Sequence, residues 1–380
     1  MSQLARFPKL SPDHYRHILR EPAGRLRCVI DTDTRNEIDD QYALAWAFLS
    51  RDKLEIEGIY AAPYSFQERV NEQREADRIR QRGPASDEER ALLARHSALL
   101  RQLDQAGIDV NDDRQMDPQG AVLVTPGQGM ELSHQEILKV CDKLGVGFSD
   151  RVFRGSDRYL ASLDEPVESG AVEHLIATAK TATVDDPLQV VAIGAATNVA
   201  AALLLAPEII ERIVVSWTAG YPTTVMDIVQ PSFNMEQDLL ASQLLFDSGA
   251  PLVYLPGFHV GAQLSLSLPE VEAWVQGKGE IGDYLHWLYI NNPHHPRHGF
   301  VDHFARSWIM WDLINFAWLI NPAWVPSYLT DAPYLSADCR WFRQGPPRHP
   351  MREALDINRD AIYRDFFGKL AALSWPPRSG

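Results

Sequence analysis

Five acidic residues gather where one apolar segment ends, near the start of the chain. The segment LRCVI (26–30) has the composition of a short buried strand, and DDQYALAWAFLS (39–50) that of a helix with an acidic first turn. The five acids are Asp31, Asp33, Glu37, Asp39 and Asp40. Carboxylates packed this closely repel one another and raise one another's pKa, so they need either solvent or a bound cation.

The residue types in this cluster restrict the ion that it would hold. Carboxylate oxygens select calcium or magnesium over zinc or copper. Asp33 and Asp40 can reach one ion if the loop between them curls around it. Helix capping by Asp39 and Asp40 is the structural alternative, and it explains two acids but not five. Both interpretations stay open on composition alone.

The order of the apolar segments predicts an α/β fold. A second strand, LEIEGIYAA (54–62), follows the first helix, and this strand–helix–strand opening is typical of a mostly parallel central sheet with helices on both faces. Further strands are expected at 188–194, 210–220 and 251–257. In such sheets ligands bind outside the carboxyl ends of the strands, which is where the acids stand.

A single α/β domain is expected to span residues 1–330. Residues 66–135 are charge-rich and helical, and we interpret them as a helical insertion packed on that domain. The Pro- and Arg-rich residues 331–380 end in a helical pattern and predict a C-terminal extension packed on the domain. Two further segments, 133–146 and 303–322, are each predicted to form one helix.

The bulk composition excludes some classes of partner. A net charge of −15 disfavours nucleic acid and anionic membranes, both of which need a basic surface. No run of 18 apolar residues and no N-terminal apolar segment is present, so neither a transmembrane helix nor a secretion signal is expected. The three cysteines are far apart and match no metal spacing, which suits reduced thiols in a cytoplasmic protein.

One short motif is similar to that of the haloacid dehalogenase phosphatases. VIDTDT (29–34) comes close to their strand followed by D-x-D-x-T, although the threonine falls one place early. That resemblance implies a magnesium-dependent phosphatase in which Asp31 is the nucleophile and Asp33 the general acid. It also requires a later lysine and a later acidic pair, for which the sequence offers no clear counterpart.

A longer resemblance covers roughly residues 26–325. The opening D-x-D, spacer, D-D and helix resemble the inosine–uridine-preferring nucleoside hydrolase family, and three later segments follow in the family's order. These are VVAIGAATNVAAALLLAPEIIERIVVSWTAG (190–220), PSFNMEQDLLASQLLF (231–246) and MWDLINFAWLINPAW (310–324). Four segments in order are more specific than the phosphatase motif.

The resemblance implies calcium-dependent hydrolysis of the N-glycosidic bond of a nucleoside or nucleoside-like N-glycoside, giving free base and sugar. The residues that match the family's calcium ligands are Asp33, Asp40, Asp312 and, through its carbonyl, Ile193. Asp33 would also be the general base, and the carboxylates would stabilise an oxocarbenium-like sugar. Relatives are commonly dimers or tetramers, so a homo-oligomer is expected.

Other matches concern the sugar and the base. Asp39 and Asn234 match ribose contacts, while Ser232 replaces the glutamate of the family's E-F-N segment and Ser65 takes the place of an asparagine after the second strand. Trp311 stands where many relatives have histidine and where the purine-specific branch has tryptophan. The resemblance implies that Trp311 stacks on a base.

This sequence also departs from the family pattern. The spacer TRNEI (34–38) is two residues longer than usual, so its loop must bulge and Asn36 or Glu37 can point into the site. All the residues that match the family's metal ligands are present, whereas some of the family's sugar-binding residues are replaced. A nucleoside- or sugar-binding relative without efficient turnover is therefore the alternative that is not an enzyme.

A histidine-rich segment, NNPHHPRHGFVDHF (291–304), precedes the last motif. His294 and His298 have a spacing that suits zinc on a helix, but Pro293 and Pro296 make a regular helix there unfavourable. We interpret the segment as a loop at the rim of the pocket. It supplies three distant candidates for protonating the leaving group: His295, His298 and His303.

Overall fold

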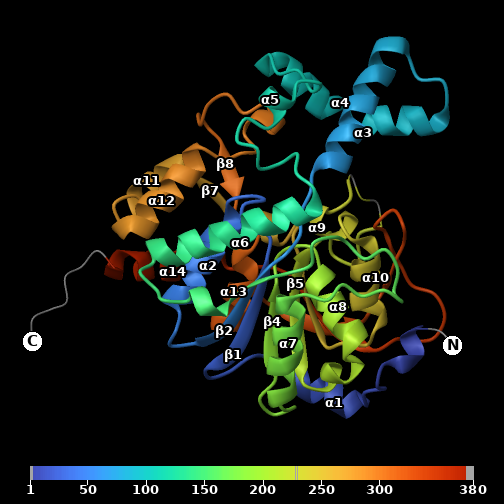
Figure 1. The fold of residues 1–380 in the computed structure, drawn as a ribbon, viewed down its shortest axis with the longest axis vertical. Coiled ribbons are helices and arrows are strands. Elements are labelled where there is room, and N and C mark those ends of the chain that lie inside the picture. Colours follow the sequence, from blue (N-terminus) through green and yellow to red (C-terminus); the bar gives the residue numbers. More distant parts are fainter. Residues whose placement is uncertain (1–2, 227, 229, 374–380) are drawn as a thin grey trace, which may run out of the picture.

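An eight-stranded sheet forms the centre of the molecule (Figure 1), in a computed structural model that describes residues 3–226, 228 and 230–373. The strand order is β3-β2-β1-β4-β5-β6-β12-β9. The strands are β1 (Leu26–Thr32), β2 (Leu54–Ala61), β3 (Val152–Arg154), β4 (Leu188–Ala192), β5 (Ile213–Ala219), β6 (Leu252–Pro256), β9 (Ser327–Asp331) and β12 (Pro350–Ala354). Neighbouring strands are parallel except β9 and β12. The predicted mostly parallel α/β fold is confirmed.

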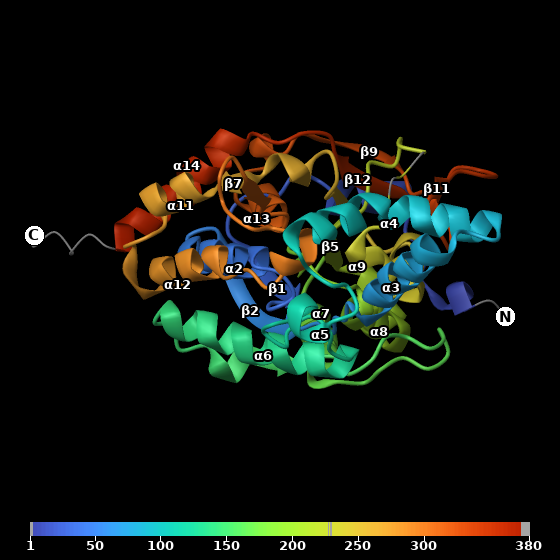
Figure 2. The same ribbon diagram turned by 90° about the horizontal axis from the view of Figure 1, so that it is seen from above.

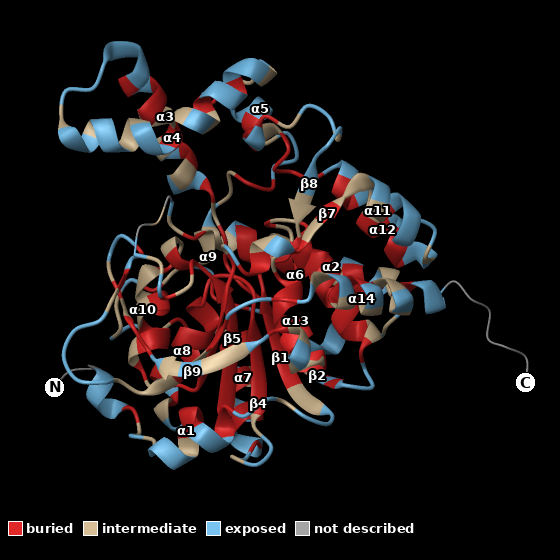
Figure 3. Cartoon of the chain, turned by 180° about the vertical axis from the view of Figure 1, so that it is seen from behind, coloured by how far each residue is buried: buried red, intermediate tan, exposed pale blue. Residues whose placement is uncertain are grey.

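Helices cover both faces of this sheet. One face packs against α2 (Asp39–Leu49), α6 (Pro126–Lys143), α13 (Leu313–Ile320) and α14 (Arg359–Leu373). The other packs against α7 (Gly170–Thr181), α8 (Thr197–Leu205) and α10 (Leu239–Asp247). Side chains alternate along β1, so that Cys28 and Ile30 meet the first group and Val29 the second. The buried residues in Figure 3 gather on the sheet and these helices.

The remaining elements are short or lie outside these layers. They include the helices α1 (Pro12–Ile18), α9 (Phe233–Glu236), α11 (Leu268–Trp274) and α12 (Gly279–Ile290) and the 3-10 helix η5 (Pro296–His298). The strands are β7 (Ser265–Ser267), β8 (Ser307–Ile309), β10 (Tyr334–Leu335) and β11 (Trp341–Phe342). They form two separate two-stranded ladders, β7–β8 and β10–β11.

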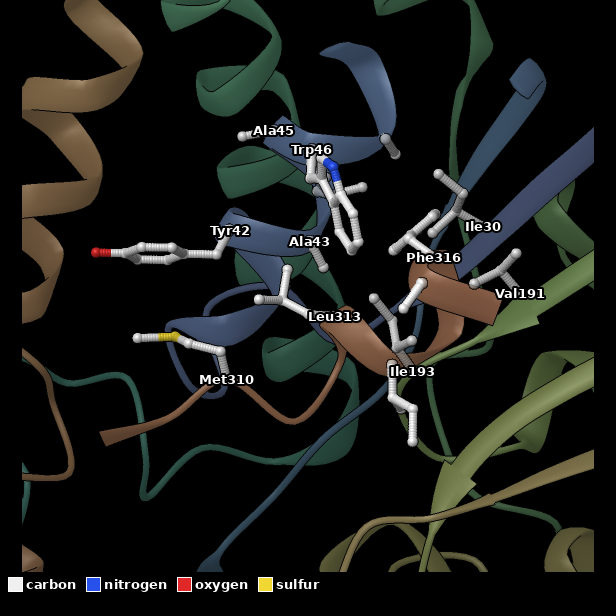
Figure 4. Packing of buried hydrophobic residues seen from close by; sticks show 14 of the residues in the cluster. Ile30, Tyr42, Ala43, Ala45, Trp46, Val191, Ile193, Met310, Leu313 and Phe316 are labelled. Atoms are coloured by element: carbon white, nitrogen blue, oxygen red, sulfur yellow. The ribbon is translucent and has the colours of Figure 1, made fainter. Parts of the chain in front are cut away.

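Helices α2 and α13 pack together on the sheet and hold the site's acids. Trp46 from α2 and Phe316 from α13 are fully buried and lie close to Ile30 and Val191 of the sheet (Figure 4). Both helices are apolar around most of their circumference, because they lie between the sheet and an outer layer. This packing fixes the N-terminal ends of the two helices relative to each other.

The inserted segment forms a helical hairpin that projects beyond the sheet (Figure 1). It consists of α3 (Gln67–Arg82) and α4 (Asp87–Ala106), which lie side by side in Figure 2, followed by α5 (Asp113–Met116). Gly83 ends α3 with a φ of 84°, a conformation that suits glycine. Its small apolar cluster includes Val70, Leu100 and Leu103.

Two helix predictions were wrong in their limits. The helix expected at 133–146 begins at Pro126, where Thr125 and Gln128 form the capping box, and so Ser133 lies inside α6. The helix expected at 303–322 is only α13, and β8 precedes it. Residues 307–309 pair with β7 instead, which leaves Asp312 at the N-cap position of α13.

The residues after 331 take part in the central sheet. Strand β12 pairs in parallel with β6 and antiparallel with β9, so it lies between them. Helix α14 then covers the face that α2 also covers, and Phe366 packs against Trp46 and Tyr42. The segment expected as a packed extension therefore supplies one strand of the central sheet, the β10–β11 ladder and helix α14.

Candidate active site and metal centre

The acids lie where β1 ends and α2 begins. Asp31 is the next-to-last residue of β1, and Asp39 and Asp40 are the first two residues of α2. Asp312 approaches from the distant segment that precedes α13. Ile38 occupies the N-cap position of α2 and makes no side-chain cap bond, so capping does not account for the two aspartates.

Three of these carboxylates meet at one point. Oxygen atoms of Asp39, Asp40 and Asp312 all lie within 4.8 Å of one another, and each residue is at most 3% exposed. An all-oxygen group of this size and charge suits a hard divalent cation such as calcium or magnesium. The structure thereby brings together Asp40 and Asp312, two of the carboxylates predicted to bind the metal, although 272 positions separate them.

The electrostatics of the group call for a cation. Burial raises the pKa of Asp33, Asp39, Asp40 and Asp312 well above the usual range, and repulsion by neighbouring carboxylates raises it further. Only hydrogen bonds act in the opposite direction, such as the one that the Thr32 hydroxyl donates to Asp40. The residues present therefore fit a bound metal.

Asp33 borders this trio. Its Oδ2 accepts a hydrogen bond of 2.8 Å from Asn36 Nδ2, and its charge acts on Asp40 and Asp312. The residue is 1% exposed and lines the cavity described below. A Cβ atom on Gly194 would lie 2.9 Å from Asp33 Cγ, so only glycine leaves room for this carboxylate.

The predicted carbonyl ligand, Ile193, is held from two sides. Its amide donates to the Asp31 carbonyl at 2.9 Å, and its own carbonyl accepts from Asn234 Nδ2 at 3.1 Å. Asn234 Nδ2 also donates to the Thr218 carbonyl at 3.0 Å. These two bonds use both amide hydrogens of Asn234 and leave its Oδ1 as an acceptor.

Asp31 has different surroundings from Asp33. It is fully buried in β1, its Oδ1 accepts from Asn198 Nδ2 at 2.7 Å, and its Oδ2 has no partner. Burial raises the pKa of Asp31 to about 7. It is not among the residues that line the cavity, so it lacks the access that a nucleophile requires.

A cavity of about 720 Å³ opens above the acids. Its floor holds the carboxylates, and one wall carries three predicted residues: Ser232, Asn234 and Trp311. Trp311 meets Phe258 edge-on, with ring centroids 5.6 Å apart. Residues of α3 and α4 in the helical hairpin also line the cavity, so the insertion is part of the site.

Ser65 does not reach the cavity. Its hydroxyl donates to the Val124 carbonyl at 2.7 Å and its amide donates to Gln237 Oε1 at 3.1 Å. Both bonds tie it to the base of the insertion. Ser65 is not among the residues that line the cavity, so its predicted contact with substrate stays a prediction.

The longer spacer bulges as predicted. Arg35 has a φ of 103°, and the Asn36 side chain folds back onto Asp33. His294 Nε2 donates to the Asn36 carbonyl at 2.5 Å, which ties the spacer to the histidine-rich loop. Glu37 lines the cavity. The spacer thus points one carboxylate into the site.

The histidine-rich segment is a rim loop, as interpreted. His294 and His298 line the cavity, whereas His295 and His303 are not among its lining residues. No histidine joins a potential metal group in the described part of the chain. Burial lowers the pKa of His294 well below its usual value, and Arg297 donates to its Nδ1 at 2.8 Å.

Several cavity residues were missed from the sequence. Phe66 and Phe233 stack with centroids 3.7 Å apart, and Arg297 and Arg69 lie over these two rings. Phe66 follows β2 and Phe233 opens α9, so they meet only in three dimensions. No local sequence pattern marks such a pair.

The sequence profile of the inosine–uridine preferring nucleoside hydrolase family matches residues 28–352. This chain belongs to that family. Membership makes it a hydrolase that acts on N-glycosyl bonds, and the alternative of a haloacid dehalogenase-type phosphatase is wrong. The position of Asp312 is consistent with family membership, because it lies with Asp39 and Asp40 in the carboxylate group, whereas a phosphatase built on Asp31 gives it no role.

Solved structures share the fold at low sequence identity. A purine-preferring ribonucleoside hydrolase from Gardnerella vaginalis is 18% identical, with a TM-score of 0.61 over 92% of this chain and 99% of its own. A plant nucleoside hydrolase is 15% identical, with a TM-score of 0.59 over 91% and 99%. The effector protein XOO4466 is 14% identical, with a TM-score of 0.52 over 97% and 100%. No curated protein sequence matches this chain.

In the ranges that the structure describes, no helix is both long and apolar enough to cross a membrane.

Proposed function

We propose that this nucleoside hydrolase family member cleaves the N-glycosidic bond of a nucleoside or nucleoside-like N-glycoside with calcium bound above the acids. The observation that carries the proposal is the buried group of Asp39, Asp40 and Asp312 on the floor of the cavity. Its negative charge matches both a divalent cation and the positive charge that develops on the sugar during cleavage.

The proposed ligands of calcium are the carboxylates of Asp33, Asp40 and Asp312 and the carbonyl of Ile193. Asp39 lies close enough to join them or to bind the sugar hydroxyls. A bound divalent ion lowers the pKa of water and orients hydroxyl groups. The all-oxygen donors and the charge of the group favour calcium over softer metals.

Asp33 is proposed as the general base. In the reaction, the bond between the anomeric carbon and the base nitrogen breaks, and a water oxygen bonds to that carbon. Asp33 accepts a proton from this water, while the departing base gains a proton and leaves neutral. The neighbouring carboxylates stabilise the oxocarbenium-like sugar between the two bond changes.

The other cavity residues would position the substrate. Asn234 can accept a sugar hydroxyl through Oδ1, because its amide hydrogens are used by two carbonyls. Ser232 lies beside it, and Asp39 is on the floor. Trp311 presents an aromatic surface on the wall, which favours a purine base by stacking. His298 lines the cavity, but burial lowers its pKa to about 3, so it is neutral and the departing base takes its proton from solvent.

Release of free base from a panel of nucleosides tests the proposal. The calcium-loaded protein should release base from at least one purine nucleoside, and chelation of calcium should abolish the release. A protein that binds calcium and nucleosides but releases no base would instead be the binding relative. The fold does not decide between these two outcomes, since an effector protein also has it.

On the basis of the resemblance, we also propose that the protein is a homo-oligomer and that it is cytoplasmic. Sedimentation of the purified chain would measure the oligomeric state, and fractionation of cells would measure the location.

A further inference from the structure

The cavity carries charges of both signs. Besides the aspartates at the end of β1, the lining holds four arginines, Arg69, Arg95, Arg297 and Arg306, together with Glu37, Glu72 and Glu236. The arginines come from three segments, namely α3, α4 and the histidine-rich rim loop with the residues that follow it. In a chain with a net charge of −15, this concentration of positive charge in one cavity calls for an explanation.

Arg297 is the central member of this group of arginines. It is 4% exposed, its Nη1 donates to His294 Nδ1 at 2.8 Å, and its Nε has no hydrogen-bond partner. Its guanidinium lies 4.0 Å from the centroid of Phe66. No ion pair to Arg297 forms among the described residues. A buried guanidinium with an unused donor is costly unless an anion binds there.

Within the residues that the structure describes, the carboxylates nearby pair with only two of the four arginines. Glu37 acts electrostatically on both Arg297 and Arg69, yet it forms no ion pair with either within the described part of the chain. Arg69 is already paired with Glu236, and Arg95 with Glu72 at 3.3 Å. These pairs leave the charge of Arg297 unmatched.

Arg306 adds a second unmatched charge at the mouth of the cavity. Its guanidinium lies 4.8 Å from the centroid of Phe300, and no carboxylate pairs with it in the described ranges. The residue is exposed and still lines the cavity. A ligand could therefore meet Arg306 at the mouth and Arg297 deeper inside.

We propose that Arg297 and Arg306 form a phosphate subsite, and that the preferred substrate is a nucleoside carrying a phosphate group. The inference rests on the proposed function, because it places the sugar at the carboxylates of Asp39, Asp40 and Asp312 and the phosphate at Arg297 and Arg306. Guanidinium groups match phosphate oxygens with two parallel hydrogen bonds.

The volume of the cavity agrees with a ligand larger than a nucleoside. About 720 Å³ lies in the upper part of the range of about 300–1,000 Å³ that is typical of small-molecule sites. The stacked rings of Phe66 and Phe233 lie beside Arg297 and Arg69. The same part of the cavity thus offers an apolar surface next to the charge.

Titration calorimetry of the full calcium-loaded chain tests the subsite, with adenosine, its 5′-monophosphate and its 5′-diphosphate as probes. Each phosphorylated probe should bind about 10- to 100-fold more tightly than adenosine, as expected for charge-assisted hydrogen bonds. Arg297→Gln should remove most of this preference, and Arg306→Gln should reduce it. Adenosine itself should bind equally well to all variants.

Arg90→Gln is the matched control. Arg90 lies on α4 like Arg95, but it pairs with Asp87 and is not among the residues lining the cavity. This variant should keep the full preference for phosphate. Arg306→Gln also covers the case in which Arg297→Gln fails to fold, because Arg306 is exposed.

Two results would overturn the subsite: equal affinity for adenosine and its phosphates, or a preference that survives both Arg297→Gln and Arg306→Gln. The second result would assign the phosphate to the metal. Base release reports separately on the proposed function. Cleavage of adenosine without a phosphate preference rejects the subsite alone, whereas a phosphate preference without any base release supports the subsite and rejects hydrolysis.

Discussion

Asp31 and Asp33 stand two positions apart in the sequence and have different roles in the structure. Asp31 is enclosed in β1 and bonded to Asn198, while Asp33 faces the cavity beside the other acids. In an extended strand, residues two positions apart point to the same face, so strand geometry alone would give Asp31 and Asp33 the same surroundings. The loop that begins at Asp33 makes the difference.

The first prediction compares these two acids. Asp33→Asn should lower base release by about 10²- to 10⁴-fold, because the general base is lost. Asp31→Asn should change it much less, since the new amide can still accept the hydrogen bond from Asn198. Steady-state kinetics with the best nucleoside of the panel measure both, and near-normal melting temperatures confirm that the variants fold. Retained activity in Asp33→Asn would reject its role as the base.

Most of the acids could be predicted from the sequence because they lie close together along the chain. Asp33, Asp39 and Asp40 stand within one strand–loop–helix segment, and Asp312 came from the family resemblance. Arg297 and Phe66 could not be found in this way, because their contact joins segments more than 200 residues apart. Ser65 was expected to contact substrate from its place after β2, but its hydroxyl donates to the Val124 carbonyl.

At the scale of elements, α2 and α13 determine where the carboxylates meet. Trp46 and Phe316 are fully buried between these helices and the sheet. The sequence predicted α2 closely, but it extended the helix at 303–322 by ten residues in the N-terminal direction. Continuous apolar runs do not distinguish a strand from a helix, and here the pairing of β8 with β7 decided the outcome.

The second prediction concerns this packing. Phe316→Ala should lower the free energy of unfolding by about 3–5 kcal/mol, because it removes a fully buried ring and leaves a cavity. Calcium affinity should fall as well, since α13 begins directly after Asp312. Urea denaturation and calcium titration measure the two effects.

Phe304→Ala is the control for this substitution. Phe304 is 88% exposed, so the same chemical change there should leave both the stability and the calcium affinity nearly unaltered. Equal losses in the two variants would show that the packing of α13 is not the cause.

At the scale of the whole molecule, the site joins three separate parts of the chain. The α/β sheet supplies the floor, the helical hairpin supplies one wall and the histidine-rich loop connects the two. Gly299 lies so close to Gln102 of α4 that a Cβ atom there would approach its carbonyl to 2.8 Å. The alternation of strands and helices predicted the sheet, whereas the docking of the hairpin onto the rim loop depends on contacts that no single segment encodes.

The third prediction concerns pH and calcium. Asp33, Asp39, Asp40 and Asp312 have a raised pKa in the folded chain, so without metal the folded state binds more protons than the unfolded state. Its stability therefore falls as pH rises above the unfolded value of about 4 and through the folded pKa values. Calcium offsets this loss by binding the ionised carboxylates, by about 2.7 kcal/mol at 100 times its Kd.

Thermal unfolding with and without calcium, followed between about pH 4 and pH 8, measures this linkage. The increase in Tm from calcium should be small at the acidic end and should grow with pH. An increase that is the same at every pH would mean that calcium binds outside the carboxylate group.

The most direct test of the central claim is a crystal structure of the calcium-loaded chain, with anomalous scattering to locate the ion. We expect one calcium ion on the cavity floor with roughly six to eight oxygen ligands at about 2.4 Å. Asp33, Asp40, Asp312 and the Ile193 carbonyl should be among them. A floor without an ion at saturating calcium, or an ion bound away from Asp40 and Asp312, would contradict the account.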